Sequence, residues 1–230
     1  ASAMIGLWDL SQANISAQMG DPTVHITATD DPGRTLREPR QFLTPAVSLG
    51  MLFRQWPLLT LSVIRSGESY CHITIPTSEA IRFSELPQEA HPYGVLRTYY
   101  LATILPEERA ETASDRFNRI WLTGIARLTS ARLTELQHIQ RELPKSFVAY
   151  EDAAEALGRV VAQVLDMLSD VPAPDAQTEI SRRRLVEAMT LLRRGLRQEL
   201  NSLKSRGGRT QRGIHSLIRR ATSIISRFDE

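Results

Sequence analysis

Two histidines lie in matching sequence contexts, His25 in VHITATD and His72 in CHITIPT, and each begins a His-Ile-Thr triplet. Both runs alternate apolar and polar residues, which is typical of half-buried β-strands. Residues i and i+2 of a strand point to the same face, so each histidine would project together with Thr27 or Thr74. An imidazole titrates near neutral pH, so two of them can accept a proton at one atom and donate one at another. Acid–base catalysis is therefore one interpretation of the pair, and two half-exposed strand histidines are the other.

The two triplets resemble the motif of two-histidine phosphoesterases, in which each of two strands presents His-x-Thr/Ser followed by an apolar residue. Here the apolar residues are Ala28 and Ile75. The resemblance implies that His25 and His72 act as acid and base on a cyclic phosphodiester while the two threonines hold phosphate oxygens. It covers only these short motifs, and the family fold is a duplicated α/β unit with several strands in each half. The helical pattern after Pro106 departs from that fold, so the sequence favours two structural histidines over the enzyme.

No other motif for catalysis or cofactor binding stands out. The five histidines show no paired metal spacing such as HExxH, and the chain has no GxxxxGK[ST] loop and no GxSxG elbow, so neither cofactor nor metal is expected. Cys71 is the single cysteine, which excludes an internal disulfide, and its place in a strand pattern predicts a buried thiol. A reducing, cytoplasmic compartment is the expectation for such a chain, and its apolar runs are too short to span a bilayer.

Charge is distributed unevenly along the chain. Residues 181–230 carry 13 Arg or Lys and 4 Asp or Glu, whereas residues 1–180 carry 15 and 22. The basic residues of the C-terminal part are nearly all arginines, whose planar guanidinium groups bind phosphates and carboxylates through two parallel hydrogen bonds. This part of the chain therefore predicts a binding surface for a polyanion.

The C-terminal arginines fall on predicted helices, on sides away from the apolar residues, and around the glycines of KSRGGRTQRG. This pattern predicts contact with the backbone of RNA or DNA, and such binding weakens as salt rises. No aromatic residue is interleaved with the arginines, so base stacking is not expected. A solvated basic face, an acidic partner protein and an anionic membrane surface are the alternatives. The predicted nucleic-acid-binding residues are Arg182, Arg183, Arg193, Arg194, Arg197, Lys204, Arg206, Arg209, Arg212, Arg219, Arg220 and Arg227.

Proline divides the chain, because nine of the twelve prolines fall within residues 1–106 and proline disfavours helix interiors. The first part therefore mixes short elements and turns. The elements expected there are a strand at 22–31, a helix that starts near Thr44 and Pro45, a β-hairpin formed by 58–65 and 70–76, a strand at 79–86, and a segment at 93–105 that fits either helix or strand.

The second part has the apolar spacing of amphipathic helices, at about 106–143, 149–170, 176–206 and 211–228. The predicted fold class is α+β, with a mixed α/β region at 4–105 that contains the hairpin and a bundle of about four helices at 106–230. The apolar helix faces also predict a homo-oligomer. The sequence thus favours a non-enzymatic, self-associating structural protein that binds nucleic-acid backbone. An adaptor or matrix-like scaffold subunit is the alternative.

Overall fold

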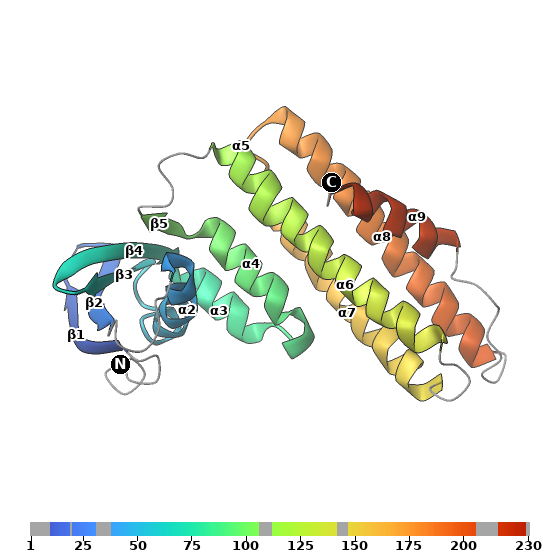
Figure 1. Cartoon of the computed structure of the whole chain (residues 1–230), viewed down its shortest axis with the longest axis horizontal. Coiled ribbons are helices and arrows are strands. Elements are labelled where there is room, and N and C mark those ends of the chain that lie inside the picture. The colour runs from blue at the N-terminus through green and yellow to red at the C-terminus, as the bar shows by residue number, and fades with distance from the viewer. Residues whose placement is uncertain are drawn as a thin grey trace. The chain divides into compact units, whose positions relative to one another are not determined.

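The computed structural model of the chain describes residues 10–18, 20–30, 38–105, 112–141, 147–205 and 216–228. Two units make up the chain: Ala1–Pro87 with Gly94–Thr112, and Gln88–Tyr93 with Ala113–Glu230. The first contains a sheet and the second contains long helices (Figure 1), so the predicted α+β class is confirmed. The boundary predicted at residue 106 lies outside the described residues.

The sheet of the first unit has five strands in the order β1-β2-β3-β4-β5. β2 and β3 are parallel, and the other neighbouring pairs are antiparallel. The predicted strand and hairpin are confirmed as β2 and as β3 with β4. Ser66 and Gly67 both have positive φ, 53° and 82°, as a two-residue turn between twisted strands requires. The strands are β1 (Leu10–Ala17), β2 (Thr23–Asp30), β3 (Leu58–Arg65), β4 (Glu68–Pro76) and β5 (Thr103–Leu105).

One face of the sheet packs against α2 (Leu43–Leu52) and α3 (Thr77–Glu85) (Figure 1). The apolar positions of β2, β3 and β4 are fully buried on this side, and Cys71 is buried among them as predicted. The expectation that 79–86 forms a strand is wrong. Its residues lie in α3, where Glu79 accepts hydrogen bonds from Arg97 of 2.6 and 3.2 Å. Arg97 belongs to α4 (His91–Leu101), so most of the ambiguous segment is helical.

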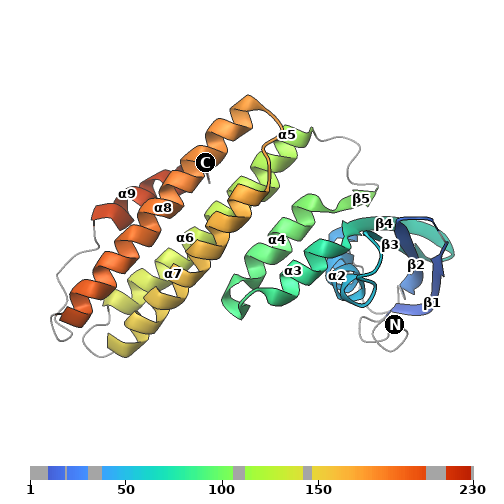
Figure 2. The same ribbon diagram turned by 180° about the vertical axis from the view of Figure 1, so that it is seen from behind.

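Long helices make up the second unit, and Figures 1 and 2 show α6, α7 and α8 side by side with α9 against α8. The predicted helices are confirmed where the structure describes them, and the first of them contains a π-helical segment, η4. Residues 106–111, 142–143, 206 and 211–215 of the predicted ranges lie outside the described residues. Leu185, Met189, Leu192 and Leu196 of α8 are fully buried, as their spacing of three and four residues predicted. The segments are α5 (Ala113–Arg116), η4 (Phe117–Leu122), α6 (Thr123–Arg141), α7 (Phe147–Asp170), α8 (Ala176–Ser205), α9 (Ser216–Ile225) and η5 (Ser226–Phe228).

Helix α9 packs on α8 at Gly195. A Cβ atom at this position would lie 2.7 Å from Ile218 Cγ1 and 3.1 Å from the Ile218 backbone nitrogen. These distances are shorter than ordinary van der Waals contact, so only glycine allows the two helices to come this close. The contact sets the position of α9 along α8, and it therefore sets which polar side chains of the two helices face each other.

Candidate functional site

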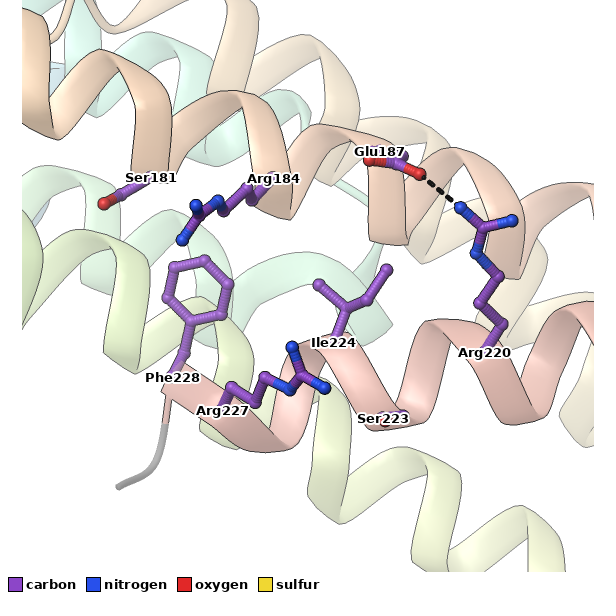
Figure 3. A pocket seen from close by; sticks show the side chains of 8 residues that line it. All are labelled: Ser181, Arg184, Glu187, Arg220, Ser223, Ile224, Arg227 and Phe228. Carbon is purple, nitrogen blue, oxygen red and sulfur yellow. Dashed lines mark hydrogen bonds and ion pairs between the residues drawn. The ribbon is translucent and has the colours of Figure 1, made fainter.

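A groove of about 700 Å³ lies between α8 and the α9–η5 segment (Figure 3). Helix α8 lines one wall, and α9 with the following 3₁₀ turn lines the other. Because the Gly195 contact holds these helices together, residues more than thirty positions apart in the sequence meet across the groove. The lining residues are Ser181, Arg184, Glu187, Arg220, Ser223, Ile224, Arg227 and Phe228.

Three arginines converge on this α8/α9 groove: Arg184 from one wall, and Arg220 and Arg227 from the other (Figure 3). Arg220 stands on α9 and Arg227 on η5, and both line the same wall of the groove. Arg220 Nη2 donates a hydrogen bond of 3.0 Å to Glu187 Oε1, and both side chains are more than half exposed. Arg184 and Arg227 make no hydrogen bond or ion pair with another described residue, so their guanidinium groups can bind an anion.

A second basic groove, of about 410 Å³, lies between α7 and α8. Arg193, Arg197 and Lys204 line it from α8, and Arg159 lines it from α7. Lys204 Nζ lies 2.8 Å from Glu155 Oε1 and 3.3 Å from a carboxylate oxygen of Glu151. The hydrogen bond to Glu155 raises the pKa of Lys204, so the lysine stays charged but is held by these carboxylates.

Arg182 and Arg183 were predicted to bind phosphate, but in the structure both are hydrogen-bonded to the Glu179 carboxylate. Their Nε atoms each donate a hydrogen bond of 2.7 Å to this carboxylate. The bonds from Arg182 and Arg183 lower the pKa of Glu179 to about 2, so the carboxylate remains ionised at neutral pH. Arg182 also donates to the Leu168 carbonyl at 2.7 Å, which joins α8 to the end of α7. Arg182 thus contributes to helix packing.

The remaining predicted arginines divide into two groups. Arg194 and Arg219 are exposed and line neither groove. Arg206, Arg209 and Arg212 lie outside the described residues.

Sequence reasoning missed three members of the basic grooves. Arg184 was visible as the last residue of an arginine triplet, but its place opposite α9 depends on helix packing. Arg159 stands on α7, outside the strongly basic part of the chain. Phe228 ends the helix predicted at 211–228, and in the structure η5 brings it into the groove. The expectation that no aromatic side chain lies among the arginines is therefore wrong.

The two His-Ile-Thr motifs lie on the side of the sheet opposite α2 and α3. In the strand register His25 pairs with Thr60, and Thr60 pairs with Thr74 of β4. In the next row Thr27 pairs with Ser62, which pairs with His72. The flanking positions of all three strands are buried on the other side, so both histidines and their threonines share one solvent-facing side.

Both histidines have polar neighbours on this side, and His72 has two hydrogen bonds. His72 Nδ1 lies 2.8 Å from Ser62 Oγ, and His72 Nε2 lies 2.9 Å from Ser69 Oγ. His25 Nε2 lies 3.5 Å from a carboxylate oxygen of Asp21. Strands β2 and β4 are two strand spacings apart and the histidines are offset by two residues, so their Cα atoms are about 12 Å apart by standard sheet spacings.

Comparison with family models, curated proteins and solved structures finds no match to this chain. Among the described residues, no helix has the length and apolar content needed to cross a membrane. The same residues contain no group of three side chains suited to hold a metal ion.

Proposed function

We propose that the chain binds the phosphate backbone of nucleic acid through the exposed basic side chains of α8 and the α9–η5 segment, here called the basic surface. The observation that carries the proposal is the convergence of three guanidinium groups on the α8/α9 groove. The basic surface consists of Arg184, Arg193, Arg194, Arg197, Arg219, Arg220 and Arg227.

The dimensions of the α8/α9 groove suit a nucleic-acid strand. Arg220 and Arg227 are seven residues apart, which corresponds to about 10 Å along the α9–η5 segment. A strand of B-form DNA carries one phosphate for about every 3.4 Å, so this length can meet about three phosphates. Guanidinium groups bind phosphate oxygens in pairs, and contacts of this kind position a strand without reading its bases.

An acidic partner protein or an anionic membrane surface would meet the same arginines, and so both belong in the first experiment. The self-association predicted from the apolar helix faces stays a prediction, because the structure contains a single chain. A structural protein that coats or packages nucleic acid would need both self-association and binding of the nucleic-acid backbone.

The first test is fluorescence anisotropy with labelled single-stranded RNA, duplex DNA and a labelled acidic peptide, beside flotation on phosphatidylserine vesicles. We expect micromolar or tighter binding of nucleic acid that falls steeply between about 50 and 200 mM salt. Binding of the vesicles or the peptide, with no nucleic acid bound at low salt, would contradict the proposal. It would assign the basic surface to the adaptor or matrix-like alternative.

A two-histidine phosphoesterase is the second candidate function, and one observation favours it: both histidines and both threonines share the solvent-facing side of the sheet. The Ser62 hydroxyl holds the His72 ring above the middle strand, which lies between the two motifs. A phosphodiester placed there could meet hydroxyl groups from three neighbouring strands.

Hydrolysis of a 2′,3′-cyclic nucleotide tests this second candidate. If it is correct, we expect wild-type turnover that His25→Ala and His72→Ala each abolish, because acid and base are both needed. His138→Ala is the matched control, since this histidine is exposed on α6 in the other unit. Absence of turnover in the wild type, or equal activity in all variants, would leave the histidines as structural residues of the sheet.

A further inference from the structure

Phe228 places an aromatic ring in the α8/α9 groove. Helix α9 ends at Ile225, and the 3₁₀ turn η5 that follows ends at Phe228. Figure 3 shows the ring directly across the groove from Arg184, with Arg227 on the same wall. Ile224 extends the apolar surface beside it, and the ring is half-buried. The groove therefore combines an aromatic surface with charged groups that suit phosphate.

The two ends of the groove differ in charge. At one end Arg220 is paired with Glu187, whose carboxylate partly offsets the positive charge of the arginine. At the other end Arg184 and Arg227 stand beside Phe228 (Figure 3), and none of the described side chains that line this end is acidic. A phosphate group is therefore attracted to the Phe228 end. The hydroxyl groups of Ser181 and Ser223 can donate a hydrogen bond to a phosphate oxygen, and they can donate to or accept from a sugar hydroxyl.

An aromatic ring beside two guanidinium groups suits one nucleotide of a single strand. In a duplex both faces of each base are stacked on neighbouring bases, whereas an unpaired base can leave the stack and lie on a side chain. The groove volume of about 700 Å³ lies within the range of small-molecule sites, and so it can hold a base with its sugar and phosphate.

We infer that the α8/α9 groove binds single-stranded nucleic acid, with a base stacked on Phe228 and its phosphate bound by Arg184 and Arg227. This inference rests on the proposed function and adds to it, because backbone contacts alone would treat single and double strands alike. It assigns Phe228 a direct contact with the ligand.

The test compares Phe228→Leu and Phe228→Trp with the wild type, using a labelled single strand of RNA and a duplex of the same sequence. We expect Phe228→Leu to weaken single-strand binding about tenfold, which lies within the usual range for loss of one stacked base. Phe228→Trp should keep the affinity, because it keeps an aromatic face. Duplex binding should change little in either variant, and thermal melting verifies that both fold.

Three outcomes would overturn the inference. Unchanged single-strand affinity in Phe228→Leu would remove the stacking contact and leave the proposed backbone binding in place. Equal losses of single-strand affinity in the Leu and Trp variants would show that the Phe228 ring packs η5 and does not stack on a base. Failure of the wild type to bind any nucleic acid would remove both the inference and the proposed function, so the two failures are distinguishable.

Discussion

Replacing Arg184, Arg220 and Arg227 together with glutamine is expected to weaken binding of a nucleic-acid strand by about a hundredfold. Each hydrogen bond from a guanidinium to a phosphate contributes about 1 kcal/mol or more, and 1.4 kcal/mol corresponds to a tenfold change in affinity. All three side chains are exposed, so the melting temperature should change little. Anisotropy titrations at one low salt concentration measure the change in affinity.

The matched control replaces three exposed arginines of α6, Arg127, Arg132 and Arg141, with glutamine. This variant loses the same net charge from the same unit, but none of its three substituted residues lines the α8/α9 groove. We expect it to bind nearly as well as the wild type. If both triple variants lose affinity equally, then net charge rather than the groove governs binding, and the assigned site is wrong.

Gly195→Val is the second exchange with a large expected effect. The side chain would collide with Ile218 and force α9 away from α8, and overpacking of this kind costs about 1–3 kcal/mol of stability. The displacement would also separate Arg220 and Arg227 from Arg184, so nucleic-acid affinity should fall together with stability. Urea unfolding and anisotropy of the same preparation measure the two effects.

Gly158→Val is the matched control for this exchange. Gly158 lies in α7, and a Cβ atom built there meets nothing within 4 Å. Valine has a higher helix propensity than glycine, so this variant should be as stable as the wild type or slightly more so. Equal stability of the two valine variants would show that α9 does not depend on the close contact at Gly195.

The elements that sequence reasoning found are those with a regular apolar pattern. The hairpin of β3 and β4 alternates strictly, and the long helices of the second unit repeat apolar residues every three or four positions. Strand β1 was missed, because only Leu10 of LSQANISA is buried and the register shifts between Ser11 and Asn14. Gln12 has a φ of 50° at this irregularity, which breaks the alternation that a strand prediction uses.

Helix α3 shows how tertiary contacts override a local pattern. EAIRFSEL contains Ile and Phe at a spacing of two, which is typical of strands. In the structure Glu79 is instead buried in an ion pair with Arg97, and the Thr77 hydroxyl donates to the Pro57 carbonyl at the start of the helix. A buried salt bridge between residues eighteen positions apart has no local sequence signature, so this helix could not be predicted from its own residues.

The candidate site was predictable in composition but not in arrangement. The uneven charge identified the C-terminal helices, and the arginines were predicted on helix sides away from the apolar residues. The sequence does not show that Glu179 binds Arg182 and Arg183. A glutamate three or four residues before an arginine also occurs on exposed helix surfaces where the two side chains do not pair. The sequence also gives no indication that η5 brings Phe228 into the groove.

The salt dependence of binding, measured for the wild type and for the triple variant Arg184→Gln, Arg220→Gln, Arg227→Gln, tests the central claim most directly. Each phosphate contact to a single strand contributes about 0.7 to the slope of log affinity against log salt. We predict a steep slope for the wild type and a slope shallower by about 2 for the variant, as expected for three lost contacts. Equal slopes would show that these guanidinium groups do not neutralise phosphates, and would contradict the account.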